Sequence, residues 1–271
     1  SGMESGRPRL ELRSIKGRIF HFWQSGKIKV LNNSTNLNFL IGINIMKNEK
    51  VHKIAEGNTA EIFEIDDKKV LKLFKTGYSK STVYHEYDNH CMVSRVMENI
   101  PEMFEFVEKN QRFGFTMEKV QGKSLASLML GHDTFEQAME IFTSLHKNWL
   151  TKTMDAAVPY TEWMLHMLSG KSNVGDLVDK IKNLPSGNSL CHGDFHPYNI
   201  ILPSEKDFVI IDFANVCKAP KEYDVARTYF LLRQAVMEKT VAGLYLKKMQ
   251  MEYSDIRVYI EVLEILRRYE L

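Results

Sequence analysis

Residues 190–216 read LCHGDFHPYNIILPSEKDFVIIDFANV, and this stretch places two acidic residues in contrasting surroundings. Asp194 lies in a segment interrupted by Gly and Pro, which disfavour regular helix, so we expect a shaped loop there. Asp212 follows residues 208–211, a β-branched apolar run that is typical of a buried strand. The stretch therefore predicts one carboxylate on a loop and another at the end of a strand.

Asp194, Asn199 and Asp212 together offer carboxylate and amide oxygens, the ligands that Mg²⁺ prefers. Burying a carboxylate is costly unless it is paired, hydrogen-bonded or bound to a metal. We therefore expect a cation site in this stretch. The alternative is structural, an aspartate that caps a turn beside two hairpin strands.

The pattern HxDxxxxN at residues 192–199, followed by IDF at 211–213, resembles the catalytic loop and the metal loop of the kinase fold. Its form HGDxHPxN is similar to that of the aminoglycoside phosphotransferase and choline kinase-like family, which phosphorylates small molecules. The resemblance implies an α+β, bilobal protein kinase-like fold with a small antiparallel-sheet N-lobe and a mainly helical C-lobe. It also implies Asp194 as catalytic base and Asn199 and Asp212 as Mg²⁺ ligands.

Two more side chains take supporting roles by the same resemblance. His192 is expected to support the loop rather than to act as a base. Asp224 begins a DxA sequence inside a helix predicted over residues 222–232, and the resemblance implies that it braces the catalytic loop. An acid favoured by the dipole at a helix N-terminus is the alternative, and both interpretations can hold.

Upstream, residues 51–75 predict two strands, a polar turn and a third strand. In the kinase-like interpretation, Gly57, Asn58 and Thr59 belong to the loop over the nucleotide phosphates, whose backbone N–H groups bind anions. The segment has this single glycine in place of GxGxxG. An ordinary hairpin turn is the alternative.

The alternation of a strand puts Lys72 on one face of the third predicted strand with Val70 and Phe74, and a lysine among apolar neighbours needs an anionic partner. The helix predicted over residues 79–98 offers Glu86, and the resemblance implies that this ion pair orients the ammonium toward the α- and β-phosphates. Lys75 and Asp88 compete for the two roles. A surface lysine and a solvated helix glutamate form the structural alternative.

A strand predicted over residues 113–118 leads into a segment that resembles the linker between the lobes, with adenine bound to the backbone around Glu118 and Val120. Beyond it the pattern turns helical, with an apolar stripe over residues 134–150. His146 lies near the end of that helix, where a packed or surface residue is expected rather than a catalyst.

The composition predicts a globular protein in a reducing cytoplasm. The three cysteines, Cys91, Cys191 and Cys217, follow no disulfide or zinc pattern. Residues 46–271 hold 29 basic and 32 acidic side chains, which argues against a nucleic-acid partner. No apolar run approaches the roughly 18 residues of a membrane span, and no signal peptide is recognised.

Three segments follow from these patterns. Residues 1–45 are basic and poorly periodic, which suggests an N-terminal extension, a tag or a non-native segment. Residues 46–118 form the predicted nucleotide-binding N-lobe, and residues 119–271 the C-lobe that carries the catalytic and acceptor-binding residues. The oligomeric state stays open.

The function predicted by the resemblance is transfer of the γ-phosphoryl group of ATP, with GTP as an open alternative, to a hydroxyl of a small molecule, using Mg²⁺. An aminoglycoside is the first candidate acceptor, with His196 and Tyr198 near it. A catalytically silent nucleotide-binding or scaffold protein is the alternative, disfavoured because the key lysine, aspartates and asparagine are all present. A protein kinase is disfavoured by the HGDFHPYN loop.

Overall fold

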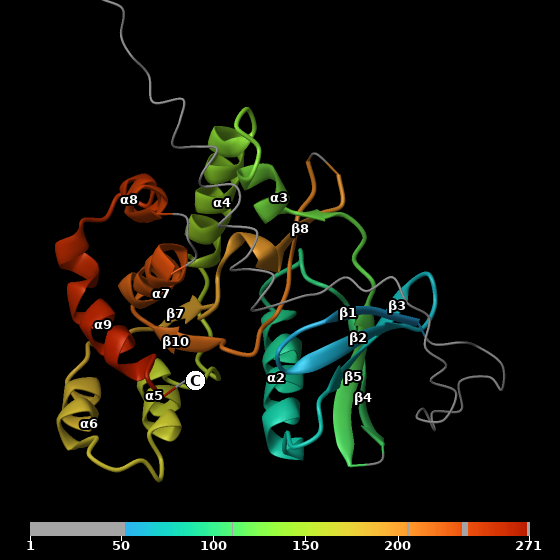
Figure 1. The fold of residues 1–271 in the computed structure, drawn as a ribbon, viewed down its shortest axis with the longest axis horizontal. Helices are drawn as coiled ribbons and strands as arrows, with labels where there is room; N and C mark the ends of the chain where they lie inside the picture. Colours follow the sequence, from blue (N-terminus) through green and yellow to red (C-terminus); the bar gives the residue numbers. More distant parts are fainter. Residues whose placement is uncertain (1–51, 110, 205, 235–237, 270–271) are drawn as a thin grey trace, which may run out of the picture.

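The computed structural model describes residues 52–109, 111–204, 206–234 and 238–269. The predicted N-terminal extension, residues 1–45, lies outside these described residues. None of the described helices is long and apolar enough to cross a membrane. Figure 1 shows a sheet with one helix on one side of the molecule and a group of helices on the other.

The N-terminal part is a five-stranded antiparallel sheet with the order β1-β2-β3-β5-β4. Its strands are β1 (His52–Glu56), β2 (Ala60–Glu64), β3 (Lys69–Phe74), β4 (Met103–Lys109) and β5 (Arg112–Glu118). The sequence predicted four of these strands, and the edge strand β4 was not predicted. β3 lies between β2 and β5, so Lys72 is anchored by neighbours on both sides.

Helix α2 (Lys80–Val93) packs on this sheet through an aromatic cluster. The ring of Tyr87 lies 6.1 Å from that of Phe115, and the ring of Phe106 lies 5.8 Å from that of Tyr87. The helix ends five residues before its predicted end at Glu98, because bonds such as Val96 N–H to the Val93 carbonyl tighten the chain into a turn.

The C-terminal part is mainly helical, which confirms the predicted α+β class. Its helices are α3 (Leu125–Met129), α4 (Phe135–Trp149), α5 (Tyr160–Met167), α6 (Gly175–Lys182), α7 (Lys221–Gln234), α8 (Glu238–Lys248) and α9 (Tyr253–Leu266). The apolar stripe of α4 is buried as predicted, with Phe142 and Trp149 both fully covered.

Short strands frame the loop that carries Asp194. β7 (Ser189–Cys191) pairs with β10 (Cys217–Ala219), and β8 (Ile200–Leu202) pairs with β6 (Lys123–Ser124) and β9 (Val209–Ile210). A 3-10 turn, η1 (Pro197–Asn199), precedes β8. β9 is one residue shorter at each end than the predicted strand over 208–211. Beyond its C-terminal end, Asp212 lies in the left-handed region at φ 71°, which ends the extended conformation.

Candidate active site

Lys72 and Glu86 form the ion pair that the sequence predicted. Lys72 Nζ donates to Glu86 Oε1 at 2.5 Å and lies 3.4 Å from Asp212 Oδ1. The competing residues lie elsewhere, since Lys75 pairs with Glu56 at 3.0 Å and Asp88 is exposed. Lys72 therefore connects the sheet to helix α2 and to the segment after β9.

Electrostatics keep the Lys72 ammonium charged. Burial by itself lowers its pKa, but the charges of Asp212 and Glu86 outweigh burial and hold the pKa above its usual value. At neutral pH the site therefore contains a fixed positive charge with one nearly buried carboxylate and one half-buried carboxylate beside it. Such a charge is suited to bind an anion.

The other predicted nucleotide contacts lie on turns and on a connecting segment. Gly57 N–H donates to the Ala60 carbonyl at 2.8 Å, so Gly57, Asn58 and Thr59 form the hairpin turn between β1 and β2. Their proposed contact with phosphates stays a prediction.

Glu118 ends β5, and its carboxylate accepts a hydrogen bond from Glu102 N–H at 3.1 Å. Val120 follows in the segment that leads to the helical part. This side-chain contact anchors the start of the connection, while adenine binding to its backbone stays a prediction.

Glycine is required at position 193 of the loop. Gly193 has φ +73°, and a Cβ built there would lie 2.3 Å from the Asn215 carbonyl oxygen. A side chain would combine an unfavourable backbone conformation with a clash against another segment. The close approach brings the Asp194 loop against the chain that follows Asp212.

Asp224 holds the backbone of this loop. Its carboxylate accepts hydrogen bonds from His192 N–H and Gly193 N–H, each at 2.8 Å, and from His146 Nε2 at 3.2 Å. Burial raises the pKa of Asp224, but these hydrogen bonds, led by that of His146, lower it below its ordinary value. The contact expected from the resemblance is therefore present, and the carboxylate is ionised at neutral pH.

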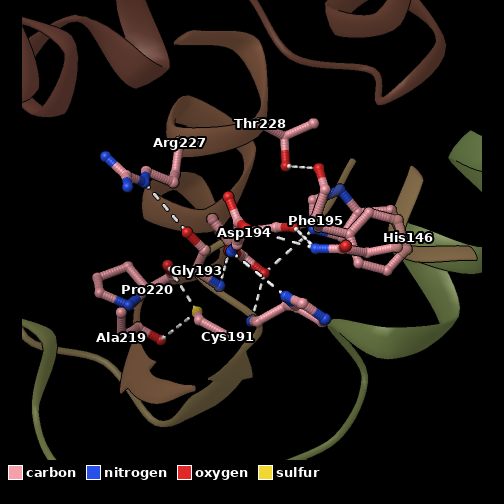
Figure 2. A network of polar contacts seen from close by, with 12 residues as sticks. His146, Cys191, Gly193, Asp194, Phe195, Ala219, Pro220, Arg227 and Thr228 are labelled. Atoms are coloured by element: carbon pink, nitrogen blue, oxygen red, sulfur yellow. Dashed lines mark hydrogen bonds and ion pairs between the residues drawn. The ribbon is translucent and has the colours of Figure 1, made fainter. Parts of the chain in front are cut away.

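Figure 2 shows three side chains around this loop, His146, Arg227 and Thr228, whose contacts with it were not predicted from the sequence. His146 is a packed residue, as predicted, with its ring stacked 4.1 Å from that of Phe195. Arg227 Nε donates to the Gly193 carbonyl at 3.1 Å, and Thr228 donates to the Phe195 carbonyl at 2.9 Å.

Helical spacing could have revealed two of these three residues. Positions i+3 and i+4 from Asp224 lie on the same helix face, which makes Arg227 and Thr228 candidates to face the loop.

His192 supports the loop in its neutral form. Burial lowers its pKa, and its Nε2 lies 3.2 Å from the Ile211 carbonyl oxygen. A carbonyl only accepts, so Nε2 carries the hydrogen, and Nδ1 then accepts from Asp194 N–H at 3.3 Å. His192 thus connects the Asp194 loop to the residue that precedes Asp212.

The acidic residues and the amide of the site fit a magnesium ion. Asn199 Nδ2 donates to the Asp194 backbone carbonyl at 2.9 Å, which leaves its amide oxygen as a metal donor. Ile211 N–H donates to the Asn199 carbonyl at 3.0 Å and brings Asp212 next to it in the fold. No cluster of three or more His, Cys, Asp and Glu side chains within the described ranges is placed to hold a metal. Two oxygen donors suit Mg²⁺, which completes its shell with water and substrate phosphates.

His196 and Tyr198, the residues expected near the acceptor, lie beside each other, and His196 lies beside the Asp194 side chain. His196 Nε2 is 3.4 Å from Asp194 Oδ2, and Tyr198 is half-buried beside His196. Asp155 and Glu162 are exposed acidic residues of the helical part.

The model of the phosphotransferase enzyme family, named APH, matches residues 178–247. The match includes the Asp194 loop, Asp212 and Asp224. No curated protein matches the chain significantly.

Solved structures with the same fold include several aminoglycoside phosphotransferases. Aminoglycoside-3'-phosphotransferase of type VIII is 13% identical, and the match covers 83% of this chain and 93% of that chain with a TM-score of 0.60. A thermostable mutant of aminoglycoside phosphotransferase APH(4)-Ia is 15% identical, with 82% and 87% covered and a TM-score of 0.60.

APH(3'')-Id from Streptomyces rimosus, in complex with ADP and streptomycin, is 14% identical, with 80% and 92% covered and a TM-score of 0.58. These likenesses confirm the kinase-like fold and the resemblance to aminoglycoside phosphotransferases. The family match over residues 178–247 supports a phosphotransferase.

Proposed function

We propose that this chain transfers the γ-phosphoryl group of ATP to a hydroxyl group of a small molecule. The observation that carries the proposal is the position of Lys72 Nζ, 2.5 Å from Glu86 and 3.4 Å from Asp212. A charged ammonium on the sheet thus lies beside a carboxylate of the helical part. The phosphate chain of a nucleotide requires this combination of a cation and a metal-binding carboxylate.

In this proposal, Lys72 donates hydrogen bonds to the α- and β-phosphates while Glu86 fixes its direction. Asn199 and Asp212 would hold a Mg²⁺ ion, which would supply neutralisation of phosphate charge. Asp194 accepts the proton of the acceptor hydroxyl as its oxygen bonds to the γ-phosphorus and the bond to the ADP oxygen breaks. Positioning and electrostatics supply most of the rate enhancement.

The remaining nucleotide contacts come from backbone groups. The turn formed by Gly57, Asn58 and Thr59 would cover the phosphates with its N–H groups. The segment from Glu118 to Val120 would bind the adenine edge. GTP presents a different base edge, so measuring both nucleotides decides between them.

An amine-bearing hydroxyl compound, with an aminoglycoside as first candidate, is the proposed acceptor. Exposed Asp155 and Glu162 on the helical part support a cationic acceptor. Several structures of similar fold were solved with streptomycin or gentamicin bound. We place the reaction in the cytoplasm, where ATP and Mg²⁺ are available.

The test is ATP turnover with Mg²⁺ and a panel of aminoglycosides, choline-like amines and sugar alcohols. Asp194→Asn keeps the shape of the side chain, and we expect it to lower kcat at least about 100-fold while ADP binding is retained. Asp88→Asn makes the same change on the exposed face of α2 and is the control.

Two outcomes would contradict the proposal. Nucleotide binding without turnover by any acceptor would favour a catalytically silent nucleotide-binding protein. Full activity of Asp194→Asn would remove Asp194 as the base.

A further inference from the structure

Asn89 is a buried polar side chain of α2 that points at the segment after Asp212. Its Nδ2 donates to the Phe213 carbonyl at 3.0 Å and lies 3.5 Å from the Ala214 carbonyl oxygen. Carbonyl oxygens only accept hydrogen bonds, so the amide nitrogen must face them. The side chain is 1% exposed, and replacing its donor would leave the Phe213 carbonyl without this bond.

Asp212 is held through both of its chain neighbours. On one side, Ile211 N–H donates to the Asn199 carbonyl at 3.0 Å, and the Ile211 carbonyl accepts from His192. On the other side, the Phe213 carbonyl accepts from Asn89. Asp212 itself has φ 71°, a conformation that persists in a non-glycine residue when its surroundings hold it.

The ring of Phe213 is fixed as well. It stacks on Trp149 at 5.9 Å with an interplanar angle of 5°, and the ring of His90 lies 4.9 Å away, nearly perpendicular to it at 87°. His90 follows Asn89 directly on α2. The backbone and the ring of Phe213 therefore both contact the same helix.

Glu86 and Asn89 are three residues apart on α2, which places them on one helix face. Glu86 holds Lys72, and Lys72 Nζ lies 3.4 Å from the Asp212 carboxylate. Asn89 holds the backbone one residue after Asp212. Two side chains on one helix face thus bear on Asp212, Glu86 through Lys72 and Asn89 through the Phe213 carbonyl.

We infer that Asn89 is a positioning residue that sets the direction of the Asp212 carboxylate toward the metal bound with the nucleotide. The hydrogen bond to the Phe213 carbonyl stabilises the left-handed backbone conformation of Asp212, in which its carboxylate faces Lys72. The inference rests on the proposed function, in which Asp212 is a Mg²⁺ ligand. Asn89 acts through the chain and contacts neither nucleotide nor metal.

The test compares ADP binding with and without metal. Calorimetry measures the dissociation constant of ADP in excess Mg²⁺ and again in EDTA, for the wild-type chain and for Asn89→Asp, which keeps the shape of the side chain and, when ionised, removes the donor. We expect ADP binding in Mg²⁺ to weaken about tenfold, because a buried carbonyl loses its donor, and binding in EDTA to change less than about twofold. Asp88→Asn makes the reverse exchange on the exposed side of the same helix and is expected to match the wild type in both conditions.

The outcomes separate this inference from the proposed function. Asn89→Asp with wild-type affinity in Mg²⁺, or with equal losses in Mg²⁺ and EDTA, would overturn the role of Asn89 alone. A wild-type chain that binds ADP equally with and without Mg²⁺ would overturn the metal role of Asp212, and the role of Asn89 with it. If Asn89→Asp does not fold, Asn89→Ala removes the donor without adding a charge and is judged by the same criteria.

Discussion

Lys72 Nζ lies 3.4 Å from Asp212 Oδ1, although 140 residues separate them along the chain. Lys72 belongs to the middle of the sheet, and Asp212 follows a two-residue strand packed among the helices. Glu86 completes the contact from α2. Any relative movement of the sheet and the helical part would change the distance between the charges that the proposed nucleotide must bridge.

Replacing Lys72 with Met should impair the use of ATP. Methionine keeps most of the apolar volume and removes the charge, so kcat/KM for ATP should fall at least about 100-fold. Glu86 would lose its partner, and the free energy of unfolding should fall by about 3 kcal/mol. Steady-state kinetics and urea denaturation measure the two effects.

Lys75→Met, which removes only a surface pair with Glu56, should change stability by less than about 1 kcal/mol. Unchanged ATP kinetics in Lys72→Met would reject the phosphate role.

Alanine at Gly193 should destabilise the protein more than alanine at another left-handed glycine. Gly170 has φ +74°, and a Cβ added there would meet nothing within 4 Å, so Gly170→Ala should cost about 1 kcal/mol from the backbone alone. Gly193→Ala adds a clash with the Asn215 carbonyl and should cost about 3 kcal/mol or more. Urea denaturation compares the two variants. Equal losses in the free energy of unfolding would show that the close approach of Gly193 to Asn215 adds nothing to the cost of a side chain at position 193.

Asp224→Asn should destabilise the protein and slow the reaction. The amide cannot accept from His192 N–H, Gly193 N–H and His146 together, so a buried donor loses its partner at a cost of about 1–3 kcal/mol. The Asp194 loop would shift with its backbone, and kcat should fall more than the affinity for ADP. Asp179→Asn on the exposed face of α6 is the matched control. An Asp224→Asn variant with wild-type kcat would limit this residue to a role in stability.

Stability should fall as pH drops below about 6.5, the ordinary pKa of histidine. Burial lowers the pKa of His90 and of His192, so the unfolded chain binds protons that the folded chain does not. The stabilisation is fully present above the unfolded pKa and is lost as pH falls toward the folded pKa, at up to about 1.4 kcal/mol per pH unit for each histidine. Urea denaturation from pH 5 to 8 measures it.

His90→Gln should make this pH dependence shallower, since one of the two histidines is removed. Glutamine still offers a donor for the Pro101 carbonyl, which His90 contacts at 2.7 Å. His166→Gln, on the exposed part of α5, is the control. A slope that stays the same in His90→Gln would assign the pH dependence to other groups.

The local patterns of the sequence predicted most of what lies near the site. Alternation placed Lys72 on a strand and helical spacing placed Glu86 on α2, so their contact followed from two local patterns and the resemblance. The predictions failed at the edge strand β4, which the sequence analysis did not include, and at the irregular segment around Asp212. The strand before Asp212 is shorter than its apolar run, and Asp212 after it is left-handed. Its conformation depends on hydrogen bonds from distant segments, which a local pattern does not contain.

The sequence by itself determined the chemical groups available in this chain: a lysine on a strand, a glutamate on a helix, and two aspartates and an asparagine at a spacing that resembles the catalytic and metal loops of the kinase fold. Tertiary structure decided how these groups are held. Asn89 reaches Phe213 across 124 residues and His146 reaches Asp224 across 78, and neither contact has a local signature. Helix periodicity sets which face a side chain occupies, but only packing of the whole chain sets what that face meets.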